Sequence, residues 1–155
     1  MDSEINNGEV MHKLAIIGDV HGCAEELRQL VNYVRYKYRS SAVSFYHVGD
    51  LVDRGPDSGK VIDLVMREFD GGVMGNHEST ILRSWDKHKA YGYMPKNPDK
   101  AKTISQLNDR RANYLKSLPL LHVFDEAKIV LCHGGLYPKI PFYLQANMLN
   151  VSRLQ

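Results

Sequence analysis

The chain has 155 residues, 43% of them hydrophobic and 25% charged, which is the size and composition of one domain with a single core. Its formal net charge of +2 lacks the strong bias expected of a protein that binds nucleic acid or a membrane surface. No apolar run is long enough to cross a membrane.

Two further features indicate the cellular setting. Residues 1–12 are a polar tail without the apolar stretch of a signal peptide. The two cysteines, Cys23 and Cys132, do not make a disulfide framework and are expected to be free thiols, as in a reducing compartment. We therefore expect a cytoplasmic protein in which residues 1–155 form a single domain behind this tail.

The apolar pattern alternates between strand and helix periodicity, which predicts a largely parallel sheet with helices packed on it. Strands are expected at 14–17, 43–48 and 72–74, and helices at 24–38, 62–69, 79–88 and 105–118. Residues 91–102 are interrupted by glycine and proline and are expected to form an exposed loop. Residues 120–124 and 128–131 are expected to pair as a hairpin.

Polar residues follow four of the expected strands. The four sequences are Gly18-Asp19, Gly49-Asp50, Gly75-Asn76-His77 and His133-Gly134-Gly135. In open α/β sheets, ligands bind beyond the carboxyl ends of the strands. We therefore expect these groups, which are distant in sequence, to converge at one edge of the sheet.

The first two clusters combine metal-binding and anion-binding groups. Asp19 and His21 lie two residues apart and can bind one cation, although this pattern alone is common. Asp50 is a strand-end carboxylate that can bridge two cations, and Arg54 is a planar fork that can hold phosphoryl oxygens. Asp53 is a second acid that can orient a base or an acid. The alternative interpretation is a polar loop with a surface ion pair.

The other two clusters add imidazoles and an amide. Asn76 can coordinate a metal through its side-chain oxygen, and His77 can protonate a leaving oxygen, because histidine side chains in general titrate near neutrality. Alternatively, Asn76 is the N-cap of the following helix and His77 is solvated. An isolated histidine such as His133 is more often structural, but the three other clusters favour a ligand.

In this order, the blocks GDVHG, GDLVDRGPDS, GNHE and HGGLYP resemble the calcineurin-like metallophosphoesterase superfamily. They are most similar to its phosphoprotein-phosphatase-type branch, which includes bacterial and phage Ser/Thr phosphatases and dinucleoside-tetraphosphate hydrolases. The resemblance covers residues 14–138. It implies an α/β fold in which a β-sandwich is flanked by helices.

The resemblance also implies two divalent metal ions, most simply Mn²⁺, with Fe or Zn as alternatives. Five residues are expected to bind them: Asp19, His21, Asp50, Asn76 and His133. The first three would hold one metal and the last three the other, with Asp50 bridging. Two cations about 3.5–4 Å apart would activate a bridging hydroxide for in-line attack on phosphorus.

By the same resemblance, three residues are catalytic. Arg54 is similar to the family's phosphate clamp, and Asn76 and His77 are expected to contact the substrate phosphate with it. His77 is expected to be the leaving-group acid, oriented by Asp53.

The sequence departs from the family in one respect. The family supplies a further metal-binding histidine in a downstream Gly-His block, and no histidine follows His133 here. We therefore expect a chain that lacks the C-terminal part of the family domain, with an incomplete second sheet. Two consequences are expected, namely weak binding of the second metal and exposed apolar surface with a free strand edge.

The leading functional prediction is hydrolysis of phosphate monoesters or phosphoanhydrides, with a phosphoprotein or a dinucleoside polyphosphate as substrate. Polynucleotide ends are not excluded, and no membrane partner is expected. The alternative is a non-catalytic fragment that binds metal and phosphate. A nucleotide-binding module is disfavoured because neither GxxxxGK[ST] nor GxGxxG occurs.

Overall fold

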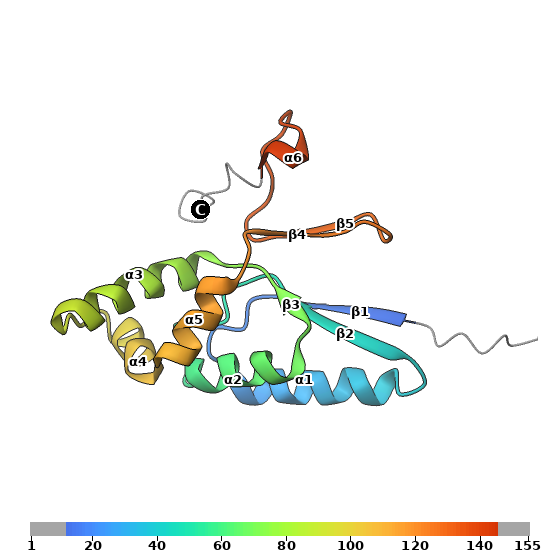
Figure 1. Ribbon diagram of the computed structural model, residues 1–155. Coiled ribbons are helices and arrows are strands. Elements are labelled where there is room, and N and C mark those ends of the chain that lie inside the picture. Colours follow the sequence, from blue (N-terminus) through green and yellow to red (C-terminus); the bar gives the residue numbers. More distant parts are fainter. Residues whose placement is uncertain (1–11, 146–155) are drawn as a thin grey trace, which may run out of the picture.

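Three parallel strands form the sheet behind the polar clusters in the computed structural model, which describes residues 12–145 (Figure 1). β1 (His12–Ile17) pairs with the whole of β2 (Ala42–His47), so that Ile17 lies opposite His47. β3 (Gly71–Gly72) pairs with the end of β2 and is shorter than the strand expected at 72–74. Because the strands are parallel, their carboxyl ends lie at one edge.

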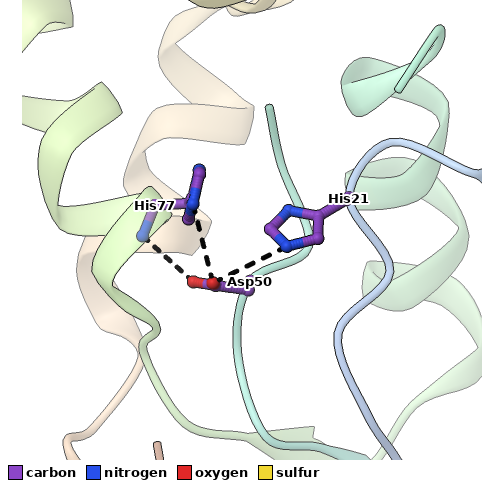
Figure 2. A group of neighbouring side chains, drawn as sticks. All are labelled: His21, Asp50 and His77. Carbon is purple, nitrogen blue, oxygen red and sulfur yellow. Dashed lines mark hydrogen bonds and ion pairs between the residues drawn. The ribbon is translucent and has the colours of Figure 1, made fainter. Parts of the chain in front are cut away.

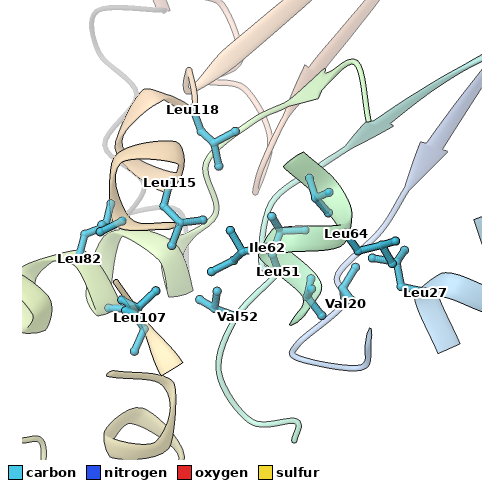
Figure 3. Packing of buried hydrophobic residues seen from close by; sticks show 14 of the residues in the cluster. Val20, Leu27, Leu51, Val52, Ile62, Leu64, Leu82, Leu107, Leu115 and Leu118 are labelled. Carbon is cyan, nitrogen blue, oxygen red and sulfur yellow. The ribbon is translucent and has the colours of Figure 1, made fainter. Parts of the chain in front are cut away.

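Two helices cover one face of this sheet (Figure 1). α1 (Ala24–Lys37) and α2 (Ser58–Glu68) each turn an apolar face inward at helical spacing. Figure 3 shows Ile62 of α2 next to Leu51 and Val52, which follow β2 and are fully buried, and Leu27 of α1 belongs to the same core cluster. The polar loop after β2 is therefore anchored in the core by its own apolar residues.

His47, the last residue of β2, belongs to the core as its strand face predicts, because its side chain is fully buried. The backbone N–H of Gly49 donates to Nδ1 at 3.3 Å, and Nε2 lies 3.2 Å from the Tyr114 hydroxyl. Burial lowers the pKa of His47 to about 4. The His47 ring also explains why residue 72 in β3 is a glycine, since a Cβ on Gly72 would lie 2.3 Å from His47 Nε2.

Three further helices form a second helical group: α3 (Asn76–Tyr91), α4 (Pro98–Gln106) and α5 (Asp109–Ser117). The prediction of an exposed loop over 91–102 is wrong from Pro98 onward. The Asn97 side chain caps α4 by accepting the Lys100 N–H at 3.0 Å, and proline suits the first helical position.

The single helix expected at 105–118 is likewise wrong. α4 ends at Gln106, and Asn108 begins α5 by accepting the Arg111 N–H at 2.9 Å. The new N-cap replaces the helical hydrogen bonds that a continuous helix would make across this point.

The expected hairpin is present and forms a second, antiparallel sheet. β4 (Leu121–Phe124) pairs with β5 (Ile129–Cys132), and the pair packs on the first sheet through Tyr46, whose ring centroid lies 5.0 Å from that of His122. The two sheets with their helices make the α/β architecture expected from the sequence. A short helix, α6 (Phe142–Gln145), follows, and none of the helices within 12–145 is long and apolar enough to cross a membrane.

One side of β1 has no strand neighbour within the described residues, since β1 pairs with β2 alone. A groove of about 420 Å³ lies there between β1 and α1, lined in part by Ile16 and Leu30. These two side chains are 40% and 41% exposed.

Candidate active site and metal centre

Asp50 lies at the centre of the converging residues. It follows β2, is buried, and has a left-handed backbone with φ 51°. The Nε2 atoms of three histidines approach its Oδ2 atom, at 3.9 Å for His21, 3.9 Å for His77 and 3.5 Å for His133 (Figure 2 shows the first two). Three segments that are distant in sequence thus meet at one carboxylate.

The second ring nitrogen of two of these histidines is held by the backbone. Nδ1 of His21 lies 3.1 Å from the Val52 carbonyl, and Nδ1 of His133 lies 2.8 Å from the Val48 carbonyl. A carbonyl only accepts, so both Nδ1 atoms carry the proton and donate it. In the neutral rings the Nε2 lone pairs then face Asp50, which is the arrangement of a metal-ligating histidine.

Asp19 and Asn76 complete the set of oxygen ligands. Asp19 Oδ2 lies 3.9 Å from His21 Nε2, and Asn76 Oδ1 lies 2.9 Å from His133 Nε2. In the latter pair an amide oxygen faces a nitrogen lone pair, and a cation bound by both atoms would satisfy them. The donor set therefore fits divalent cations that accept mixed oxygen and imidazole ligands.

The ligand atoms fall into two groups, in each of which they lie within 4.8 Å of one another. One group is His21, Asp50 and His77, and the other is Asp19, Asp50 and His133. Asp50 belongs to both, which is the position of a bridging ligand. Asp19 lies near His133 in this grouping and is also 3.9 Å from His21 Nε2, its predicted partner. His77, expected to be an acid, is near enough to be a ligand as well.

Arg54 lies over the histidines at the mouth of the site. Its Nη1 lies 3.1 Å from His21 Nε2, and its Nη2 lies 3.1 Å from His77 Nε2. The lone pair of His21 Nε2 can accept an Arg54 N–H or bind a cation, but not both. The guanidinium therefore occupies the position in which a metal cation would contact His21. A metal bound to His21 Nε2 would displace the Arg54 side chain from this position.

His77 has a carboxylate partner. Its Nδ1 lies 3.0 Å from Oδ2 of Asp53, which is buried, and its ring meets that of His21 edge to face at a centroid distance of 4.7 Å. A carboxylate accepts the Nδ1 proton and so fixes the direction of the ring. Nε2 then points into the site, where it accepts an Arg54 N–H in this structure, and it can exchange a proton with a substrate once Arg54 has moved away.

A family model described as calcineurin-like phosphoesterase matches residues 12–154, which is most of the chain. The chain belongs to this family. Curated relatives named symmetrical bis(5'-nucleosyl)-tetraphosphatase are 38% identical over 130 residues in Proteus mirabilis and 31% identical over 128 residues in Wigglesworthia glossinidia brevipalpis. Each match covers 80% of this chain and 45% of the relative, so the chain spans about half the length of these proteins.

Solved structures of phosphoesterases have the same fold. A protein assigned as a diadenosine tetraphosphatase aligns with a TM-score of 0.68 and 26% identity, over 87% of this chain and 59% of that one. A serine/threonine phosphatase from Saccharomyces cerevisiae aligns with a TM-score of 0.53 and 25% identity, over 85% and 41%.

One residue of this site lies in the GNHE block but had no predicted role. Glu78 is fully buried, and its Oε2 accepts N–H groups of Asp50 and Gly75, both at 2.8 Å. Its Oε1 accepts those of Leu51 and Val52 at 2.7 and 3.2 Å. Burial raises the pKa of the Glu78 carboxyl. Gly75 is the N-cap of α3, and Glu78 is the third residue after it. In the sequence, this spacing could have indicated the bond from Glu78 to the Gly75 N–H, but none of the other three bonds.

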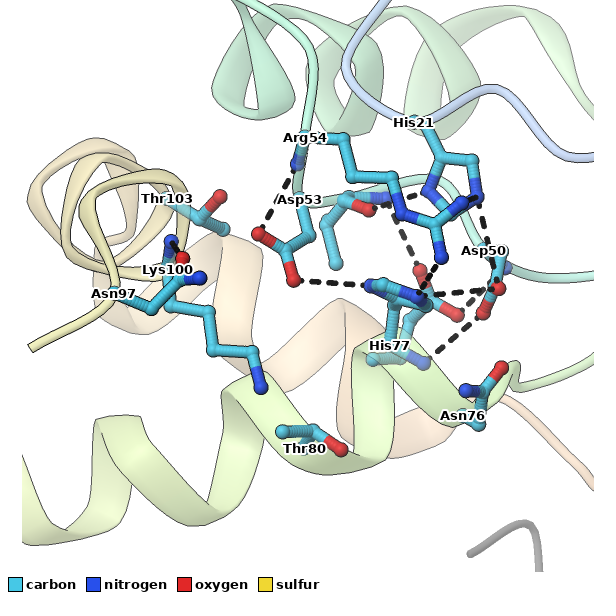
Figure 4. A network of polar contacts seen from close by, with 12 residues as sticks. His21, Asp50, Asp53, Arg54, Asn76, His77, Thr80, Asn97, Lys100 and Thr103 are labelled. Carbon is cyan, nitrogen blue, oxygen red and sulfur yellow. Dashed lines mark hydrogen bonds and ion pairs between the residues drawn. The ribbon is translucent and has the colours of Figure 1, made fainter. Parts of the chain in front are cut away.

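A second support lies under Asp53. The Ser58 hydroxyl accepts the Asp53 N–H at 3.0 Å and lies 3.2 Å from the hydroxyl of Thr103 on α4. Figure 4 shows Thr103 and Asp53. Asp53 and Arg54 have left-handed backbones, with φ 73° and 64°, which non-glycine residues adopt only where the surroundings hold them. Glu78 and Ser58 thus hold the strained loop that presents the polar groups.

Proposed function

We propose that this chain hydrolyses phosphoanhydrides in a metal-dependent reaction, with a dinucleoside polyphosphate as substrate. The observation that carries the proposal is the convergence of three histidine Nε2 atoms on one buried carboxylate, 3.5 to 3.9 Å from Asp50 Oδ2. The tetraphosphatases among its relatives support this substrate class. Their names do not support a phosphoprotein substrate.

Five residues would hold two divalent cations, namely Asp19, His21, Asp50, Asn76 and His133. Such a pair supplies a nucleophilic water of lowered pKa and compensates the charge on the phosphoryl oxygens. Mn²⁺ suits these oxygen and imidazole ligands, and Fe or Zn would be accepted by the same set. The His21 and His133 rings are already oriented for this role by their Nδ1 bonds to backbone carbonyls.

The remaining polar residues would act on the substrate. Arg54 would release His21 and hold two phosphoryl oxygens with its fork, and Asn76 would contact the phosphate as well. His77 would give its Nε2 proton to the leaving oxygen while Asp53 holds Nδ1 at 3.0 Å. Water would attack phosphorus from the side opposite the leaving group, without a phosphoenzyme.

The test is Mn²⁺-dependent hydrolysis of diadenosine tetraphosphate, with p-nitrophenyl phosphate as a general ester substrate. We expect Asp50→Asn to abolish turnover and to weaken Mn²⁺ binding, measured from the electron paramagnetic resonance signal of free Mn²⁺. Asp57→Asn is the matched control, because Asp57 lies in the same loop but pairs with Lys60 at 2.8 Å.

Each result decides between the candidate functions. Turnover that survives Asp57→Asn and is lost in Asp50→Asn supports the proposal. Mn²⁺ binding without turnover of either substrate would indicate a metal-binding protein that does not catalyse. Turnover that persists after complete removal of metal would contradict the mechanism.

A further inference from the structure

Lys100 differs from the other lysines of its segment. Residues 96–102 contain three lysines, and Lys96 and Lys102 are exposed, as expected of a solvated surface. Lys100 is half-buried. Figure 4 shows its side chain leaving α4 and extending toward α3 and Thr80. A half-buried lysine that extends toward a neighbouring helix beside a polar site suits the binding of an anion.

Hydrogen-bonding contacts connect α4 to the loop that carries Asp53. Thr103 lies three residues after Lys100, and hence on the same face of the helix. It is buried, and its hydroxyl lies 3.2 Å from that of Ser58, which in turn accepts the Asp53 N–H at 3.0 Å. The face of α4 that carries Lys100 is therefore fixed against the loop that carries Asp53.

A second cation lies on α3. Arg83 donates to the Ser79 hydroxyl at 3.1 Å and to the Thr80 hydroxyl at 3.2 Å, so its guanidinium is held beside Thr80. His77, Thr80 and Arg83 follow one another at intervals of three residues, so that Thr80 neighbours both of the others, while His77 and Arg83 lie about 120° apart around the helix. At the helical rise, this row extends about 9 Å from the site along α3.

We propose that Lys100 and Arg83 bind the phosphate groups beyond the one that reacts, so that the rim between α3 and α4 is a subsite for a linear polyphosphate chain. The inference rests on the proposed phosphoanhydride hydrolysis and deepens it. A phosphate monoester places its single phosphate at Arg54 and needs no further cation. A dinucleoside polyphosphate carries several adjacent negative charges, and the Thr80 hydroxyl, which accepts an Arg83 N–H, keeps its own hydrogen to donate.

The test is a binding measurement, which needs no turnover. Inorganic tripolyphosphate and orthophosphate are titrated calorimetrically, with magnesium in excess over each anion so that every variant meets the same complex. We expect tripolyphosphate to bind the unmodified chain more tightly than orthophosphate. Lys100→Gln should weaken tripolyphosphate binding about tenfold and leave orthophosphate unchanged, because one charged hydrogen bond is lost.

Three variants complete the experiment. Arg83→Gln should show the same selective loss, and Lys100→Arg should retain most of the affinity because it keeps the charge. Lys102→Gln is the matched control on the same helix and should change neither anion. Thermal unfolding of each variant establishes that it is folded.

The proposal is overturned if tripolyphosphate binds no more tightly than orthophosphate. It is also overturned if Lys100→Gln leaves the affinity for tripolyphosphate unchanged, or lowers the affinities for the two anions equally. Failure of the proposed function is distinguishable from these results. Binding of tripolyphosphate that depends on Lys100, without hydrolysis of any substrate, would support the subsite and contradict the proposed activity. The opposite result is hydrolysis of diadenosine tetraphosphate with the same kcat/KM and the same anion affinities in Lys100→Gln as in the unmodified chain. It would support the proposed activity and contradict the subsite.

Discussion

The Glu78 carboxylate accepts the backbone N–H of Asp50 at 2.8 Å. A buried acid on α3 therefore fixes the backbone of Asp50, the residue at the centre of the site. Asp50 has a left-handed backbone, with φ 51°, that is unfavourable for a residue with a side chain. The bonds from Glu78 to Leu51 and Val52 extend the same support along the loop. The direction of the Asp50 carboxylate thus depends on a residue that does not face the substrate.

Glu78→Gln should therefore destabilise the protein and weaken metal binding. Glutamine has nearly the same shape, but its amide nitrogen would face two N–H donors whichever way the amide turns. Leaving these buried donors unsatisfied should lower the free energy of unfolding by about 2–4 kcal/mol. Denaturant unfolding measures this loss, and Mn²⁺ titration measures the displacement of Asp50. Glu26→Gln, on the exposed surface of α1, is the control and should change neither quantity.

Asp53→Asn tests whether His77 protonates the leaving group. Without the carboxylate at 3.0 Å from Nδ1, the His77 ring loses the partner that directs Nε2 into the site, and kcat should fall about 10²-fold for an ester that needs an acid. Phenyl phosphate is such an ester, because phenol is a much weaker acid than p-nitrophenol. The loss for p-nitrophenyl phosphate should be clearly smaller. Equal losses for the two esters would show that Asp53 acts in another way.

Much of the fold follows from short-range patterns, because β2 and α2 bury apolar residues at the spacing their geometry requires. The convergence of polar residues at the sheet edge follows as well, since parallel strands bring their carboxyl ends together. The helix at Pro98 was not predicted because its first turns lack apolar residues and its start depends on the Asn97 cap.

The role of Glu78 was beyond sequence reasoning for a different reason. Its partners Asp50, Leu51 and Val52 lie 26 to 28 residues away and contribute backbone N–H groups, which every residue except proline has. No side-chain pattern marks such a contact. The Ser58–Thr103 contact is similar, because it joins two ordinary hydroxyls across 45 residues.

His47 should make stability depend on pH. Its folded-state pKa is about 4, below the ordinary value of 6.5, so the unfolded chain binds the extra proton first as the pH falls. This contribution to stability is complete above pH 6.5 and is lost between pH 6.5 and 4, by about 3 kcal/mol in total. His47→Asn keeps an acceptor for the Gly49 N–H and does not titrate. Denaturant unfolding across this range should give a flatter profile for the variant, and parallel profiles would contradict the assignment.

Two glycines at strand ends should respond differently to the same substitution. A Cβ on Gly75 would lie 2.2 Å from Asp50 Oδ1 and 2.3 Å from Asp50 N, so Gly75→Ala must displace the central carboxylate. We expect this variant to lose about 1–3 kcal/mol of unfolding free energy and to bind Mn²⁺ at least tenfold more weakly. At Gly18, beside Asp19, a Cβ would meet nothing within 4 Å, so Gly18→Ala should retain stability and metal affinity. Equal effects in the two variants would contradict the close approach of Gly75 to Asp50 as the reason for a glycine at this position.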